Sequence, residues 1–384
     1  MVKSEHFRVD NGDMVLFTLE SGRRVLADIN IRAAADDPDD ETPDVAKHLR
    51  DRLEKLGRDA QGRLYVDAFL SSHPDADHIR GLKKHFHLGP LNEWSRSADK
   101  IVIREMWSSP VVFRRASKDH VLCDDALAWC AEARRRVRVF EAGGQVADGD
   151  RIKILGADID GKTDKLGAIL VKTDDLFSTI CGVFDTTFEA RLLAPLIAKD
   201  EEEEEIIRKN NSSVIMRFDL KVNGLTQGRY LLGGDAEVGV WDRIWDHNKN
   251  RSSWLEYDVL IAPHHCSWRC LSYDSWSDMG EDAQVSQPAR NALGQARSGA
   301  LIVVSSKRVA DDDSDPPCIR AKREYEAILD PKSGEFRCVA DGASDEPLVI
   351  EVLAAGPKVK RVVFGATVAA GTGIGSQPFA HGRR

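Results

Sequence analysis

The sequence lacks the features that would place it in several large classes of protein. It has no run near the roughly 18 consecutive apolar residues of a membrane-spanning helix, which excludes an integral membrane protein. Its N-terminus lacks the positive-then-apolar pattern of a secretion signal. Its 7 cysteines include no CxxC pair, which excludes a zinc ribbon and argues against a disulfide framework. Reduced thiols and the absent signal predict a cytoplasmic protein.

The sequence also lacks an excess of positive charge. Its formal net charge is −9 over 384 residues, of which 42% are hydrophobic and 30% charged. Such a chain buries a substantial core, as one large domain or two medium ones. Because the whole surface does not attract nucleic acid, an anionic substrate would need a local positive site, such as bound metal ions.

Short apolar segments predict a mixed fold of strands and helices. Alternating residues at 14–20 and 23–31, around a short polar turn, predict a β-hairpin. Helical spacing predicts a helix over 45–56, and an apolar run predicts a buried strand over 64–70. The segment 188–210, which contains a run of glutamates, is interpreted as a helix. Many short strands flanked by helices indicate two packed sheets covered by helices.

The strongest chemical signal is His73-Pro-Asp75-Ala-Asp77-His78, directly after the predicted strand 64–70. A strand that ends in a tight loop projects alternate residues, such as His73 and Asp75, to one side. Asp77 and His78 then open a new helix. Ligand-type side chains this close together can supply imidazole and carboxylate donors to two neighbouring metal ions. The competing interpretation is a polar loop with a helix cap.

Two further strand ends carry ligand-type residues. Asp235 follows a predicted strand and two glycines that allow close backbone approach, although it could instead cap the next helix. His264 and His265 follow another predicted strand, where an exposed polar turn is the alternative. The sequence does not decide which of these two histidines binds metal. Three strand ends with such residues are more specific than any one motif.

HPDADH, LLGGDAE and APHHCS, in this order, resemble the metallo-β-lactamase fold, and in particular the hydrolase domain of ComEC-type competence proteins. The resemblance implies an α/β (α+β) protein with a four-layer αββα sandwich. It spans nearly the whole chain and implies one domain with loop insertions over residues 1–345. Residues 346–384 are then expected to form a terminal strand and a disordered, Gly-rich tail.

The resemblance also implies a role for each residue of these motifs. His73 and Asp75 would hold a first metal ion, while Asp77 and His78 would hold a second. Asp235 would bridge the two ions. Asp75 or Asp77 would accept the proton of the attacking water.

Two further roles follow from the same resemblance. His265 matches the final histidine of the family better than His264 does, because it precedes the small-residue turn. Asp28 stands where the family has an early strand-end aspartate that supports the metal-binding loop.

The sequence departs from the family pattern at three places. Asn210 or Asn211, followed by Ser212, stands where a third ligand, often histidine, is expected, and an amide is a weak ligand. Cys266 replaces a glycine, either as a buried small hydrophobe or as a soft donor near the site. The stretch 311–318 lacks a late histidine that contacts substrate.

The donor set and the resemblance together predict a chemistry. Carboxylates and imidazoles without an assured thiolate favour two divalent ions, either zinc or manganese. The expected function is a metal-dependent hydrolase, most simply a phosphodiesterase or nuclease. The basic stretches Arg114-Arg115 and Arg134–Arg138 could guide a nucleic acid, or simply form a solvated helix face.

Two alternatives remain open at this point. The substrate could be a small nucleotide or another ester, which the acidic composition favours. The chain could instead be a non-catalytic, metal-binding regulatory subunit of a multi-protein defence or DNA-processing system, with an unidentified protein partner. The missing third ligand and the missing late histidine favour this second alternative.

Overall fold

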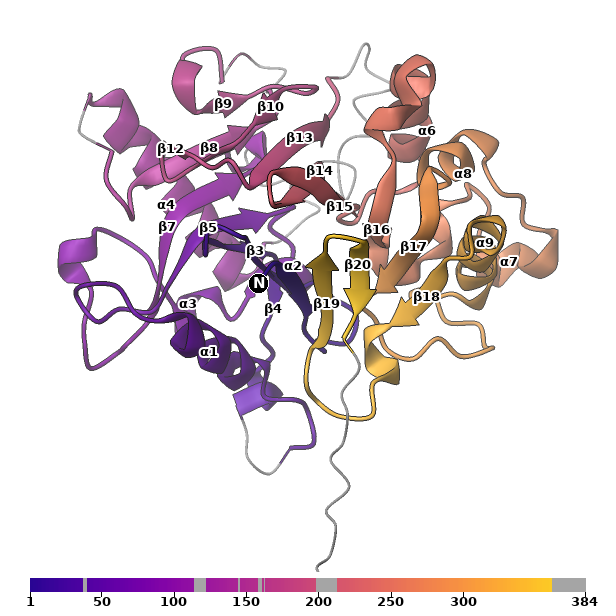
Figure 1. Ribbon diagram of the computed structural model, residues 1–384, viewed down its shortest axis with the longest axis horizontal. Helices are drawn as coiled ribbons and strands as arrows, with labels where there is room; N and C mark the ends of the chain where they lie inside the picture. Colours follow the sequence, from indigo (N-terminus) through magenta and orange to yellow (C-terminus); the bar gives the residue numbers. More distant parts are fainter. Residues whose placement is uncertain are drawn as a thin grey trace, which may run out of the picture.

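Two large β-sheets organise the chain, and helices pack against them in a mixed α/β fold (Figure 1). The structure is a computed structural model that describes residues 1–36, 40–113, 122–143, 146–157, 161, 163–197 and 213–360. The expected Gly-rich tail lies outside these described residues.

The first sheet has ten strands, in the order β20-β19-β1-β2-β3-β5-β7-β8-β9, with β6 paired to β7. Its strands are β1 (Lys3–His6), β2 (Val15–Thr18), β3 (Arg24–Ala27), β5 (Tyr65–Ser71), β6 (Phe86–His87), β7 (Ile101–Ser108), β8 (Arg151–Leu155), β9 (Leu170–Val171), β19 (Leu348–Leu353) and β20 (Gly356–Val359). The short β4 (Ile29–Asn30) forms isolated bridges beside it. The predicted hairpin is confirmed, because β2 and β3 pair antiparallel. The run β3-β5-β7-β8 is parallel.

The second sheet has seven strands, in the order β10-β13-β14-β15-β16-β17-β18. Its strands are β10 (Leu176–Phe177), β13 (Phe188–Ala194), β14 (Ile215–Val222), β15 (Leu225–Leu232), β16 (Tyr257–Ile261), β17 (Ala296–Val304) and β18 (Glu335–Cys338). The pairs β15-β16 and β16-β17 are parallel. A separate hairpin joins β11 (Thr179–Ile180) to β12 (Val183–Phe184).

Helices lie on opposite sides of the molecule, with α1 near the first sheet and α6, α8 and α9 near the second (Figure 1). The helices are α1 (Val45–Leu56), α2 (Ala76–Ile79), α3 (Leu82–His85), α4 (Asp124–Glu141), α6 (Val238–Asn248), α7 (Trp276–Met279), α8 (Gln287–Leu293) and α9 (Ile319–Leu329). The helix predicted over 45–56 is confirmed. No helix among the described residues is long and apolar enough to cross a membrane.

Three hydrophobic clusters hold these layers together. One joins the first sheet to α1 and α4, and another joins the second sheet to α6, α8 and α9. The third draws residues from both sheets, including Phe17 of the first and Phe218 of the second, whose rings are 5.4 Å apart. The two sheets therefore share a core.

The prediction of a helix over 188–210 is wrong at its beginning, where the chain forms strand β13. Phe188, Ala190 and Leu192 lie in the core shared by both sheets, whereas Glu189 and Arg191 are only partly buried. This period of two is that of a strand with one face buried. Residues 198–210, including the glutamate run, lie outside the described part of the chain.

Candidate metal centre

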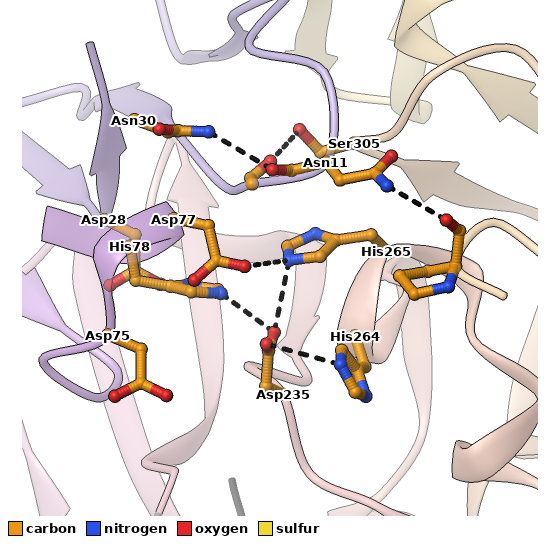
Figure 2. A network of polar contacts seen from close by, with 12 residues as sticks. Asn11, Asp28, Asn30, Asp75, Asp77, His78, Asp235, His264, His265 and Ser305 are labelled. Atoms are coloured by element: carbon orange, nitrogen blue, oxygen red, sulfur yellow. Dashed lines mark hydrogen bonds and ion pairs between the residues drawn. The ribbon is translucent and has the colours of Figure 1, made fainter. Parts of the chain in front are cut away.

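Ligand-type side chains converge where parallel strands of both sheets end (Figure 2). We use the name Asp235 cluster for Asp13, His73, Asp75, Asp77, His78, Asp235, His264 and His265. The first sheet contributes the loop after β5, and the second contributes the turns after β15 and β16. The structure therefore brings together all three sequence motifs, which lie far apart along the chain.

Asp28 holds the loop after β5 in place. Its carboxylate accepts hydrogen bonds from the Ser72 backbone at 2.7 Å and from the Ser72 hydroxyl at 2.6 Å. It also lies 3.0 Å from Nδ1 of His78, which fixes that ring with Nε2 directed at Asp235. This outer carboxylate orients a ligand-type imidazole, as in many metal sites. Asp28 thus occupies the supporting place expected from the sequence.

Asp235 lies at the centre of the cluster. Two glycines before it allow the turn after β15 to pass close to its neighbours: a Cβ on Gly233 would lie 2.9 Å from Pro263. The backbone N–H of Asp235 donates to the hydroxyl of Ser213. The expected alternative, a helix cap, does not describe this residue, because Glu237 occupies the N-cap of α6 and Asp235 faces histidines.

A left-handed turn after β16 directs both neighbouring histidines toward Asp235. The φ angles are 47° at His264, 52° at His265 and 69° at Cys266, a run that is unusual for residues other than glycine. Nε2 of His265 lies 3.5 Å from Oδ1 of Asp235, and Nε2 of His264 lies 3.8 Å from Oδ2. The structure therefore brings both histidines to the same carboxylate.

Cys266 does not offer its sulfur to the cluster. Its Sγ lies 3.8 Å from the carbonyl oxygen of Cys318, and burial raises the pKa of the thiol well above its usual value. Because the thiolate is the form that binds metals, Cys266 fits the role of a buried small side chain.

Sequence reasoning missed Asp13. It is buried in the loop between β1 and β2, and Asp13, His78, Asp235 and His265 each place one donor atom within 4.8 Å of the others. The preceding Gly12 permits this approach, because a Cβ there would lie 2.7 Å from the carbonyl oxygen of Asp77. The only signal in the sequence is an Asn-Gly-Asp turn before an apolar strand, which is too common to single out.

Several donor atoms of the cluster are buried without a hydrogen-bond partner. They are Oδ1 of Asp13, Nε2 of His73, Nε2 of His78, Oδ1 of Asp235, Nδ1 of His264 and both ring nitrogens of His265. Nε2 of His78 and Oδ1 of Asp235 are 2.8 Å apart but lack hydrogen-bond geometry. Buried polar atoms are rarely left unsatisfied, and these converge on one place. The donor set fits a divalent metal ion with mixed oxygen and nitrogen ligands.

Burial and the neighbouring charges of the cluster together shift the pKa values of its side chains. Burial alone would raise the pKa of Asp235, but His78 and His265 outweigh it and hold that pKa well below its usual value. Burial would lower the pKa of His78, but Asp235 and Asp28 raise it well above its usual value. Burial raises the pKa of Asp13 to about 7.

The remaining predicted site residues either lie at the edge of the cluster or fall outside the described part of the chain. Asp75 and Asp77 lie at the edge of the cluster, with 26% and 37% of their side-chain surface exposed. Asn210, Asn211 and Ser212 lie outside the described residues.

In the basic stretch Arg134–Arg138 on α4, two arginines are held by the fold, whereas Arg134 and Arg138 are exposed. Arg135 and Arg136 form ion pairs with Glu132 at 2.7 and 2.8 Å, and Arg136 is almost fully buried. Arg114 and Arg115 lie outside the described residues. The run over 134–138 is therefore not a free cationic surface along its length.

Searches against protein-family models and against curated proteins find no match to this chain. The functional argument therefore rests on the residues and their geometry.

Proposed function

We propose that this protein is a metal-dependent hydrolase with a metallo-β-lactamase-type fold that cleaves a phosphodiester. The proposal rests on one observation: buried imidazole and carboxylate atoms that lack hydrogen-bond partners converge on Asp235. Support for the fold comes from the hydrophobic clusters on both outer faces and between the sheets, which fit a four-layer αββα sandwich. In this proposal residues 1–345 form its single domain.

In this proposal the residues of the cluster have different roles in hydrolysis. His73, His78, Asp235 and His265 would hold the metal, because their donor atoms face one another and have few other partners. When bound, divalent ions lower the pKa of a coordinated water and neutralise charge on the ester oxygens. Asp75 and Asp77 lie where solvent reaches the cluster, and one of their carboxylates would accept the proton from the attacking water.

The substrate we propose first is a nucleic acid, and a small nucleotide is the second candidate. A specific observation favours the smaller substrate: in the basic run on α4, Arg135 and Arg136 are engaged in ion pairs with Glu132 rather than open to phosphates. The net charge of −9 points the same way. Polynucleotide binding would weaken steeply with salt, because phosphate contacts release counterions, whereas binding of a small nucleotide would depend on salt much less.

Hydrolysis of bis(p-nitrophenyl) phosphate with added manganese or zinc tests the reaction class. We expect turnover by the wild type and a loss of more than about 100-fold in Asp77→Asn. Asp246→Asn, a change at an exposed aspartate on α6, is the matched control and should retain full activity. A wild type that binds metal yet cleaves neither this ester nor a nucleotide would contradict the hydrolase proposal and favour a non-catalytic, metal-binding regulatory subunit.

A further inference from the structure

A groove opens at the same edge of the sheets as the metal centre, but other segments of the chain form it. Its walls come from the residues that follow β8 and β9, from residues 196–197 after β13, and from α6 (Figure 1). β8 and β9 continue the parallel run of the first sheet. At the end of β13, Ala194 pairs with Ile215, close to the Ser213 that contacts Asp235. The groove has a volume of about 1030 Å³.

Hydrogen bonds hold the walls of this groove in place. The hydroxyl of Thr173 donates to the carbonyl oxygen of Pro195 at 2.7 Å, which ties the segment after β9 to the segment after β13. The guanidinium of Arg243 on α6 donates to the carbonyl oxygen of Ile197 at 2.8 Å. The walls are therefore fixed before anything binds, and an occupant does not have to order them.

Apolar side chains contribute to the lining of the groove. Ile197 is 56% exposed, and Leu170 and Leu196 are half-buried. Apolar side chains that remain exposed in a hollow of the surface are typical of sites that bind another molecule. The volume lies at the upper limit of the roughly 300–1,000 Å³ that small ligands occupy, which leaves room for a segment of polypeptide.

The wall formed by residues 163–175 is acidic. Among the residues that line the groove, this wall carries the exposed carboxylates of Asp164 and Asp175 and one exposed cation, Lys172. Asp174 adds a third carboxylate, whose charge is matched by Arg251 at 2.6 Å. The opposite wall, on α6, carries charges of both signs. The free charge of the groove is therefore negative, and an occupant of complementary charge is basic.

We propose that this groove binds a basic, extended segment of a partner protein. Lysine or arginine side chains of that segment pair with Asp164 and Asp175, and an apolar side chain packs on Ile197. In the sequence, six consecutive acidic residues, Asp200 to Glu205, begin three positions after Ile197, so the chain continues from the groove with the same sign of charge. The inference does not rest on the proposed function, because no residue of the groove belongs to the Asp235 cluster.

Fluorescence anisotropy with a labelled peptide of repeated Lys-Leu-Gly tests the groove, and a peptide of repeated Glu-Leu-Gly is the matched probe of opposite charge. The titrations use the whole chain in chelator, so that their outcome does not depend on a metal ion. The wild type should bind the basic peptide at least about 10-fold more tightly than the acidic one, with an affinity that falls as salt is added.

Two variants test the two parts of the groove. Asp164→Lys combined with Asp175→Lys should weaken binding of the basic peptide by about 10-fold or more, because it places like charges opposite one another. Ile197→Ser should weaken binding by about 10-fold, because it removes the apolar contact. Hydrogen exchange of the complex should show protection of backbone amides in residues 167–175 and 243–247, and no change in β18.

The matched control reverses two exposed aspartates outside the groove, Asp278→Lys and Asp313→Lys. It has the same net charge as the groove variant, and Asp313 belongs to another acidic stretch, so it separates the groove from general attraction between charges. This control should keep the wild-type affinity, and circular dichroism establishes that every variant is folded. Equal affinity of the wild type for both peptides would overturn the inference. Equal losses in the control and groove variants, or protection only outside the groove, would also overturn it.

Discussion

Two regions of the molecule bury charged side chains, and they differ in how those charges are satisfied. The first, which we call the Glu105 network, joins Glu105, Trp107 and Lys153 of the first sheet to the backbone N–H of Cys181 in the β11–β12 hairpin. Oε1 of Glu105 accepts from Nζ of Lys153 at 2.9 Å. Oε2 accepts from the indole of Trp107 at 2.9 Å and from the backbone of Cys181 at 3.1 Å. Both oxygens of this buried carboxylate have partners.

The Asp235 cluster pairs its buried charges at close range but leaves several donor atoms without a hydrogen bond. Oδ1 of Asp235 and Nε2 of both His78 and His265 have no hydrogen-bond partner, although they lie within a few ångströms of one another. A buried polar group without a hydrogen-bond partner destabilises a fold, and in the Asp235 cluster several such donor atoms lie within 4.8 Å of one another. The Glu105 network is therefore satisfied by the fold itself, whereas the Asp235 cluster is compatible with a bound metal ion.

Glu105→Ala should have the largest effect on folding. It leaves Lys153 as an uncompensated buried charge, and breaking a buried pair in this way costs about 3–5 kcal/mol of unfolding free energy. Urea denaturation of the metal-free protein measures this loss, and metal binding by the folded fraction should be unchanged. Glu105→Gln keeps an acceptor for Trp107 and should cost less. If the Glu105→Ala protein were as stable as the wild type, the claim that the Glu105 network stabilises the fold would be wrong.

Metal should stabilise the wild type through the Asp235 cluster. A ligand that binds only the folded state adds about 2.7 kcal/mol at 100 times its dissociation constant. We expect thermal unfolding of the wild type to shift upward with added Mn²⁺ and to return after chelation. Asp235→Asn should show no such shift, because it lacks the bridging carboxylate. An equal shift in both proteins would place the metal elsewhere.

Asp28→Asn tests the outer support of the Asp235 cluster, because Asp28 contacts the ring of His78 and is not itself one of the proposed metal ligands. Loss of such an orienting carboxylate lowers metal affinity about 10- to 100-fold. Asp67→Asn is the matched control: Asp67 is a buried aspartate of the first sheet that pairs with Arg104 at 2.9 Å, away from the cluster. It should cost stability and leave metal affinity unchanged. Equal losses of affinity in both variants would contradict the supporting role of Asp28.

His6 provides an effect that appears only as the pH changes. Burial lowers its pKa from 6.5 to about 3, so between these values the unfolded chain binds a proton that the native state excludes. Stability must then fall as the pH falls, by about 1.4 kcal/mol per pH unit for this group. In chelator, the unfolding free energy of the wild type should drop more steeply than that of His6→Gln from pH 6 to pH 4. Parallel pH profiles would contradict this account.

The sequence predicts those site residues that lie close to one another along the chain. His73 to His78 form one short loop after a strand, so their types and spacing suffice to mark them as neighbours. Asp13 could not be found this way, because the contact depends on the β1–β2 loop packing against both sheets. The choice between His264 and His265 was also out of reach, since it depends on a left-handed turn that aims both at Asp235.

In the fold, too, elements with a clear local pattern are predictable, whereas those decided by long-range contacts are not. The helix over 45–56 was predictable because its apolar positions follow the period of a helix on one face. The strand Phe188–Ala194 was mistaken for a helix because a short apolar segment before a charged run fits either period. Pairing with β14 in the second sheet, which is a long-range contact, decides its conformation.

Metal content of the protein, purified without added metal and then reconstituted with Mn²⁺, tests the central claim most directly. Elemental analysis of the wild type, Asp235→Asn and Glu105→Gln would compare the two regions in one experiment. The account predicts about two ions per chain in the wild type and in Glu105→Gln, and fewer than one in Asp235→Asn. A wild type without metal, or an Asp235→Asn protein that retains it in full, would contradict the claim that the unpartnered atoms around Asp235 form a metal centre.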